Sequence, residues 1–203
     1  MKKQFRSRLI LGLIVLSSLA LVVTANGRQD DPSEGSAEIA RHLSNKNPDV
    51  RQKAAEELAR LVALDQKKLV EGYLLEEKDK RVKLALNWAV YRMGKSSALY
   101  DIVRDLDSGR RDQAIGYLAQ LESPDPLYVF LSQEKKRPKV VTGVIEVLGR
   151  IGDNESLQQI KPLADSGDPR IADAARASSV SIQQRLNEPA TVTKTRPRTI
   201  SQP

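Results

Sequence analysis

Apolar residues recur at the period of an α-helix between residues 137 and 153, RPKVVTGVIEVLGRIGD. They stand at i, i+4, i+7, i+8 and i+11, on one face of a helix: Val140, Val144, Val147, Leu148 and Ile151. Pro138 fits the first turn, where a missing N–H costs nothing, and Gly152-Asp153 predicts a left-handed exit followed by a turn. The stretch therefore predicts a helix with one buried face and two marked ends.

The same stripe recurs along the chain, and a repeat at a fixed period takes precedence over any local interpretation of the fold. Its first positions lie 28 to 32 residues apart: Val50, Val82, Arg110, Val140 and Ile171. The later positions are Ala54, Leu58 and Leu61; Leu86, Val90, Met93 and Gly94; Ala114, Leu118 and Leu121; Ala175, Ser179 and Ile182. Such a period accommodates two short helices and two turns, so each unit is predicted to be a helix pair.

The segments between the stripes supply the first helix of each pair. They are predicted at residues 36–44, 65–77, 97–106, from Leu127 after the turn Pro124-Asp125-Pro126, and 154–164, where Pro162 predicts a bend. Their inward residues are expected to be Ile39, Ala40 and Leu43; Leu69, Val70, Tyr73 and Leu74; Leu99, Ile102, Val103 and Leu106; Leu127, Val129, Phe130 and Leu131; Leu157, Ile160 and Leu163. The predicted fold class is all-α, an α-solenoid (superhelix) of about five helix pairs without a sheet.

The ends of the stripe helices resemble HEAT-like repeats, the degenerate solenoid family that includes the phycobilisome-lyase type. The openings are Pro48-Asp49-Val50-Arg51 with Ala54-Ala55, and Asp168-Pro169-Arg170-Ile171; the closing is Leu148-Gly149-Arg150-Ile151-Gly152-Asp153. The third unit departs from this repeat pattern, because Gly109-Arg110-Arg111 stands where the pattern has an apolar opening. The resemblance covers residues 36–186 and implies a scaffold or binding surface. It leaves a lyase or chaperone of chromophore attachment as an alternative.

The amino terminus predicts export. Lys2, Lys3, Arg6 and Arg8 precede an apolar run over residues 9–23, which is shorter than the roughly 18 to 20 residues that span a bilayer. Val23-Thr24-Ala25 offers a cleavage site, so residues 1–25 are predicted to be a signal peptide. The expected location is periplasmic or extracellular. The alternative is an uncleaved anchor over residues 9–25 that holds the protein at the inner membrane.

Two further segments flank the repeat domain of residues 36–186. Residues 26–35 are polar and predict a flexible leader. Residues 187–203 are rich in Thr, Pro and Arg with few large apolar side chains, and predict a disordered basic tail. Such a tail suits, at most, weak contact with an anionic membrane surface.

The charge of the chain is concentrated outside the repeats. The formal net charge is +7, and the first eight residues carry four of these charges without an acidic residue. Nucleic-acid binding is therefore not expected, because it requires a concentrated basic face. The basic residues near the turns are predicted to share one edge: Lys78, Lys80, Arg81, Lys83, Arg110, Arg111, Lys135, Lys136, Arg137 and Lys139. That edge is either a solvated surface or a contact for acidic polymers or anionic lipid heads.

Residues suited to catalysis or metal binding are scarce. The chain has no cysteine and one histidine, His42, which is predicted to lie on a helix surface. It has no phosphate-binding loop and no serine–histidine pair. We therefore expect no enzyme, no metal site and no cofactor, and packing rather than disulfides must stabilise the fold.

Candidate binding residues come from positions +2, +6 and +10 after each stripe start, which would line the concave side of a solenoid. They are Gln52, Glu56 and Arg60; Leu84, Trp88 and Arg92; Asp112, Gly116 and Gln120; Thr142, Glu146 and Arg150. Trp88, Tyr91, Arg92, Arg60, Glu56, Glu146 and Arg150 are the predicted contacts of an unidentified protein partner, since Trp and Arg are enriched in hot spots.

Two plainer interpretations stay open for these residues. Glu56 with Arg60, and Glu146 with Arg150, stand at the spacing of ordinary i,i+4 ion pairs. Trp88 alternatively fills a gap between repeats. The oligomeric state is not predicted by the sequence.

Overall fold

The computed structural model describes residues 32–133 and 137–188. The predicted signal or anchor, residues 26–31 of the leader and the tail from residue 189 lie outside the described residues, so those predictions stay predictions. The described residues form helices and no strand, which confirms the all-α prediction. Among them, no helix combines the length and the apolar character needed to cross a membrane.

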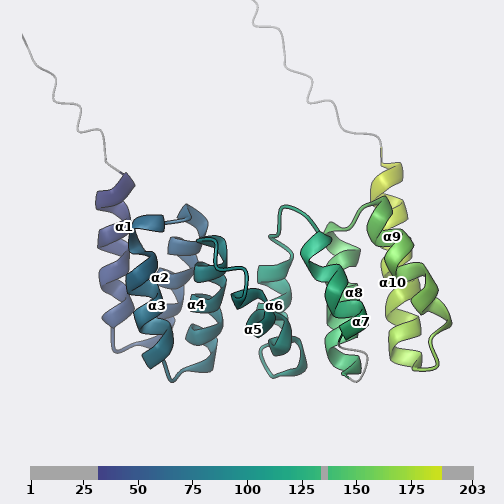
Figure 1. Cartoon of the computed structure of the whole chain (residues 1–203), viewed down its shortest axis with the longest axis horizontal. Helices are drawn as coiled ribbons and strands as arrows, with labels where there is room; N and C mark the ends of the chain where they lie inside the picture. Colours follow the sequence, from purple (N-terminus) through teal and green to yellow (C-terminus); the bar gives the residue numbers. More distant parts are fainter. Residues whose placement is uncertain (1–31, 134–136, 189–203) are drawn as a thin grey trace, which may run out of the picture. The chain divides into compact units, whose positions relative to one another are not determined.

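Ten α-helices follow one another in the described part of the chain, in chain order from α1 to α10 in Figure 1. They are α1 (Pro32–Arg41), α2 (Pro48–Leu61), α3 (Lys67–Glu76), α4 (Lys80–Arg92), α5 (Ala98–Arg104), α6 (Arg111–Leu118), α7 (Tyr128–Gln133), α8 (Pro138–Ile151), α9 (Asn154–Ile160) and α10 (Pro169–Asn187). Five 3₁₀ helices connect them: η1 (His42–Ser44), η2 (Leu64–Gln66), η3 (Asp105–Asp107), η4 (Asp125–Leu127) and η5 (Lys161–Asp165).

The even-numbered helices are the stripe helices of the sequence, and each packs on the next. Contacts join α2 to α4, α4 to α6, α6 to α8, and α8 to α10. Each of α1, α3, α5, α7 and α9 contacts the even-numbered helix that follows it. The apolar stripe explains this arrangement, because burying one face of each even-numbered helix requires a neighbour on that side.

The stripe residues are mostly buried as predicted, including Leu58, Val82, Leu118, Leu148 and Ile182. The main exceptions stand where a helix ends or shifts its face. Leu61 is 42% exposed because α2 ends there and Val62 adopts a positive φ of 51°. Ser178 rather than Ser179 is buried on α10, and the predicted inward residues Leu69 and Val129 are exposed.

Side-chain caps determine where several of these helices begin. The carboxylate or amide oxygens of Asn47, Asp79, Asp153 and Asp168 accept backbone N–H groups from the first turns of α2, α4, α9 and α10. No side chain caps α6, which is only eight residues long. Helix α8 also has no side-chain cap, so the short length of α6 rather than the missing cap distinguishes the third unit.

Three predicted helix ends differ from the structure. Gly152 leaves α8 with extended backbone at φ −66°, ψ 160°, so the predicted left-handed exit is wrong. Glycine is needed there for space, because a Cβ would lie 2.4 Å from the Leu148 carbonyl oxygen. Pro162 ends the α-helix instead of bending it, since it has no N–H to donate, and η5 follows α9. Helix α1 begins at Pro32, within the predicted leader.

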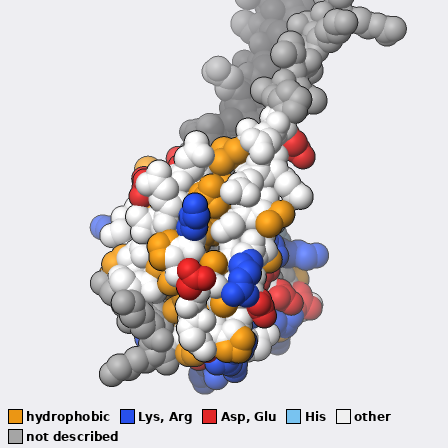
Figure 2. Space-filling view, turned by 90° about the vertical axis from the view of Figure 1, so that its right-hand side faces the viewer, with side chains coloured by type: hydrophobic (Ala, Val, Ile, Leu, Met, Phe, Trp, Pro, Cys, Tyr) orange, Lys and Arg blue, Asp and Glu red, His pale blue; other side chains and the backbone are white. Residues whose placement is uncertain are grey.

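Helix α4 is buried almost all round. Every residue from Leu84 to Val90 is buried, because α4 contacts α2, α3, α5 and α6. The prediction that Leu84 faces outward is therefore wrong. By contrast, the end of the described helices formed by α9 and α10 carries hydrophobic side chains interspersed with polar and charged ones (Figure 2).

Candidate functional site

Trp88 lies at the centre of an aromatic cluster on α4 and α6. Its ring stacks on Tyr91, with centroids 5.7 Å apart and planes at 22°, and on Tyr117, with centroids 5.7 Å apart and planes at 3°. The Arg92 guanidinium carbon lies 5.7 Å from the Trp88 ring centroid. The Trp88 side chain is only 2% exposed. Trp88 thus packs between α4 and α6, as the plainer interpretation expects, and it also lines the two clefts described below.

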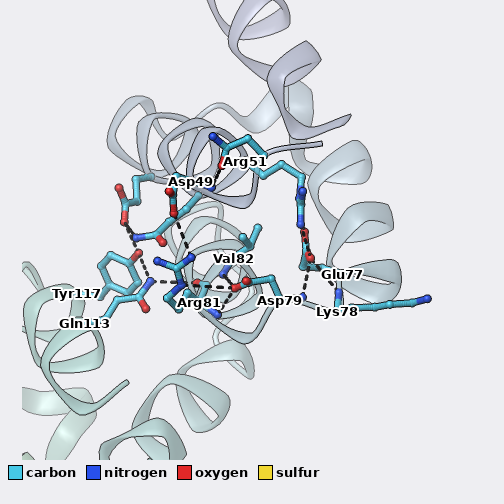
Figure 3. Close-up of polar contacts among 12 residues, drawn as sticks. Asp49, Arg51, Glu77, Lys78, Asp79, Arg81, Val82, Gln113 and Tyr117 are labelled. Carbon is cyan, nitrogen blue, oxygen red and sulfur yellow. Dashed lines mark hydrogen bonds and ion pairs between the residues drawn. The ribbon is translucent and has the colours of Figure 1, made fainter. Parts of the chain in front are cut away.

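A chain of hydrogen bonds ties this cluster to α2. The Tyr117 hydroxyl donates to Glu56 Oε1 at 2.5 Å, and Gln113 Nε2 donates to the Tyr117 oxygen at 2.8 Å. Gln113 Nε2 also donates to the Arg81 carbonyl oxygen at 3.0 Å, as Figure 3 shows beside Tyr117. Burial, and then the hydrogen bond to Glu56, raise the pKa of Tyr117, so its hydroxyl remains a donor at neutral pH.

A second polar network holds α2 against the turn between α3 and α4 (Figure 3). Arg51 donates to both carboxylate oxygens of Glu77, at 2.8 and 2.9 Å. Arg81 Nη2 donates to Asp49 at 3.1 Å, and Asp79 caps α4. The hydrogen bond from Arg51 is the largest cause that lowers the pKa of Glu77. The two networks fix the relative positions of α2, α4 and α6 around the cluster.

Two adjoining clefts meet at Trp88 and Gln120, and together we call them the aromatic groove. One has a volume of about 400 Å³ and is lined by Trp88, Tyr91, Arg92, Gly94, Ser96, Gln120, Leu121, Glu122, Ser123 and Pro126. The other has a volume of about 610 Å³ and is lined by Lys53, Glu56, Glu57, Arg60, Trp88, Gln113, Gly116, Tyr117 and Gln120. Both volumes lie within the range of ligand-binding sites.

Equivalent positions of three successive even-numbered helices meet in this groove. Glu56, Trp88 and Gly116 occupy offset +6 in α2, α4 and α6. Arg60, Arg92 and Gln120 lie at offset +10, where Gln120 lies just beyond the α6 end. Five of the predicted partner-binding residues therefore line one groove: Glu56, Arg60, Trp88, Tyr91 and Arg92.

Two other candidates lie elsewhere. Arg150 Nη2 donates to Glu146 Oε1 at 2.8 Å, as the i,i+4 interpretation expects, and Arg111 Nη2 donates to the same carboxylate at 3.2 Å. Neither Glu146 nor Arg150 lines the aromatic groove. They form part of an ion-pair network between α6 and α8.

The predicted ion pair between Glu56 and Arg60 is wrong. Arg60 instead pairs with Glu57, whose pKa is lowered mainly by the hydrogen bond from Arg60. The Glu56 carboxylate accepts hydrogen bonds from the Tyr117 hydroxyl and, at 2.9 Å, from Gln52 Nε2. Its carboxylate therefore belongs to the wall of the groove.

Several lining residues were not predicted from the sequence. Tyr117 and Gln113 are the most important, because they connect Glu56 to α6. Their spacing with Gln120, at i, i+4 and i+7, places the three on one helix face and was a usable signal. This spacing was not recognised in the sequence because the register of the third unit was uncertain.

The groove combines an aromatic floor with amide groups and charges of both signs. This arrangement suits recognition of a surface with mixed polarity. Within residues 32–133 and 137–188, no group of three or more His, Cys, Asp or Glu side chains is arranged to hold a metal ion. No protein-family model matches the chain, and comparison with curated proteins finds no match either.

Proposed function

We propose that this chain is a non-catalytic α-solenoid of HEAT-like helix pairs that binds a protein partner in the aromatic groove. The supporting observation is that equivalent positions on α2, α4 and α6 converge on one groove. This is how stacked repeats build an extended binding surface. The predicted signal at residues 1–25 assigns the proposed scaffold to the outside of the inner membrane.

A polypeptide partner fits the groove's chemistry best. Tyr91 and Arg92 line the groove, are half-buried and belong to residue types enriched in binding hot spots, whereas the almost fully buried Trp88 supports them from the core. Carboxylates in the walls, such as Glu57 and Glu122, would repel a phosphate polymer. The occupant is therefore a protein segment with charges of both signs and an apolar side chain that covers the accessible part of Tyr91.

The decisive experiment fills the groove without harming the fold. A Cβ at Gly116 meets no atom within 4 Å, and Gly116 lies in the wall of the groove. Gly116→Arg places a long side chain in the groove while improving helix propensity by about 0.5–1 kcal/mol. Gly72→Arg on α3 is the matched control, because its surroundings are equally open and it lines neither cleft.

Binding is read by site-specific photocrosslinking in cells that produce the full chain, with the crosslinker in place of Gln120. We expect one crosslinked protein, identified by mass spectrometry, that disappears in Gly116→Arg and persists in Gly72→Arg. Equal crosslinking in both variants would show that the partner does not use the groove. The N-terminus of the purified protein tests the proposed location, since export predicts that it begins at Asn26.

A further inference from the structure

A third cleft, with a volume of about 660 Å³, is lined by residues of α3, α4 and α5 and of the segments that lead into α6 and α8. Its lining residues define what we call the basic cleft: Leu74, Leu75, Lys80, Lys83, Leu84, Asn87, Lys95, Ser97, Ala98, Asp101, Arg104, Asp105, Arg110 and Arg137. Helix α4 contributes Lys80, Lys83, Leu84 and Asn87, a single stripe at i, i+3, i+4 and i+7. The basic cleft shares no lining residue with the aromatic groove.

Positive charge dominates this lining, which holds six Lys or Arg residues against Asp101 and Asp105. Four of these six cations already pair with carboxylates: Arg110 with Asp105 at 2.5 Å, Arg104 with Asp101 at 3.8 Å, Lys95 with Glu71 at 3.4 Å and Arg137 with Asp107 at 3.8 Å. Lys80 and Lys83 are exposed, and their ammonium groups make no ion pair or hydrogen bond with the described part of the chain. The cleft therefore presents two adjacent ammonium groups whose charge is not neutralised by a contacting carboxylate.

Asn87 supplies a polar group to the same cleft. The residue is only 8% exposed and lines the cleft, and its amide makes no hydrogen bond within the described residues. Among those residues, the fully buried side-chain atom without a partner is Arg110 Nε, so the Asn87 amide is accessible from the cleft. It can therefore form a hydrogen bond with water or with a ligand bound there.

Apart from Ser97, the remaining lining residues are aliphatic. Leu84 and Ala98 are buried, whereas Leu75 is 84% exposed and offers an apolar surface to a ligand. No aromatic residue lines the cleft, so nucleic-acid bases would find no ring on which to stack. A ligand that matches the cleft is anionic, carries aliphatic groups and has polar atoms for the Asn87 amide.

We infer that the basic cleft binds an acidic polypeptide segment in which carboxylate residues alternate with aliphatic ones. Side chains two residues apart on an extended chain are separated by about 6.6 Å. That distance is close to the roughly 5–6 Å between Cβ atoms at i and i+3 on a helix, the spacing of Lys80 and Lys83. The peptide backbone supplies the groups that Asn87 lacks. This site is independent of the proposed function of the aromatic groove.

The test uses the full chain and a fluorescein-labelled Asp-Leu-Asp-Leu-Asp peptide, with binding measured by fluorescence anisotropy at low salt. Lys80→Gln/Lys83→Gln removes two charge pairs and should weaken binding about tenfold. Lys67→Gln/Lys68→Gln on α3 makes the same change of charge outside the cleft and should leave affinity unchanged. Asn87→Leu should also weaken binding while the melting temperature stays the same or rises, because no internal hydrogen bond is lost.

Three outcomes would overturn the inference. The first is equal peptide affinity in the Lys80/Lys83 and Lys67/Lys68 variants. The second is equally tight binding of an Asn-Leu-Asn-Leu-Asn peptide. The third is tighter binding of oligodeoxythymidylate or phosphatidylglycerol vesicles through the same lysines, which would assign the cleft to another class of anion. Gly116→Arg should bind the acidic peptide normally, so failure of this inference can be told apart from failure of the proposed function.

Discussion

Gly149→Ala should destabilise the protein through one close approach between α8 and α10. A Cβ at Gly149 would lie 2.7 Å from Ser178 Oγ, 3.0 Å from Ser178 Cβ and 3.3 Å from Ser178 Cα. Rotating the serine side chain moves only the hydroxyl, so the steric overlap with the two carbon atoms persists. The new methyl group therefore forces the two helices apart.

The expected magnitude is the difference between two opposing effects. Replacing glycine by alanine within a helix stabilises by about 0.5–1 kcal/mol. Overpacking a close interface costs about 1–3 kcal/mol. We expect a net loss of about 1–2 kcal/mol for Gly149→Ala. A Cβ at Gly116 meets no atom within 4 Å, so Gly116→Ala should only stabilise the protein. The change in unfolding free energy caused by replacing glycine with alanine should therefore have opposite signs on α8 and α6.

Urea unfolding, monitored by circular dichroism, measures the unfolding free energies of Gly149→Ala and Gly116→Ala. Stabilisation by Gly149→Ala would refute the close approach of α8 and α10. Ser178→Gly removes the hydroxyl and Cβ that the methyl group meets, and should recover part of the loss in the double variant. Additivity of the two single substitutions to within about 0.5 kcal/mol would mean that Gly149 and Ser178 do not touch.

Three further predictions follow from buried or paired groups. Leu148→Ala should cost about 2–5 kcal/mol of unfolding free energy, because Leu148 is fully buried; a loss below about 1 kcal/mol would contradict its place in the core. The hydrogen bond from Arg51 lowers the pKa of Glu77, so the ionised Glu77 stabilises the fold above the usual carboxyl pKa. This stability is lost as the pH falls below that value and through the lowered pKa, and Glu77→Gln should flatten thermal stability over the same acidic range. Trp88 fluorescence should resist acrylamide quenching, whereas quenching as strong as that of free indole would place the ring in solvent.

The helices could be predicted because the sequence pattern that specifies each one lies within its own residues. An apolar stripe of three or four turns identifies α2, α4, α8 and α10 without any knowledge of their neighbours. Their ends depend on contacts that the stripe does not encode. Gly152 is required by the nearby Ser156 and Leu148 atoms rather than by a left-handed turn, and the exposure of Leu61 follows from the helix end beside it.

The site was predictable only in part, because its residues come from separate helices. The repeat offsets predicted Glu56, Trp88 and Arg92 as neighbours, because equivalent positions of adjacent even-numbered helices lie close together. Tyr117 and Gln113 were missed because α6 lacks the apolar opening that sets the register. The basic cleft was predicted only as an edge of basic residues that includes Lys80, Lys83 and Arg110. Its hollow and the place of Asn87 in it were not predicted, because they arise only when α3, α4 and α5 pack together.

The short, uncapped α6 has a consequence for how the molecule opens. Helix α2 packs extensively on α4, and α8 on α10, whereas α6 touches its even-numbered neighbours more sparsely. Segments with few buried contacts open at lower free energy than the rest of a protein. Amide hydrogen exchange should therefore be fastest, among the even-numbered helices, in α6. The aromatic groove takes residues from α6 as well as from α2 and α4. A bound partner would therefore hold these three helices together and slow amide hydrogen exchange in α6.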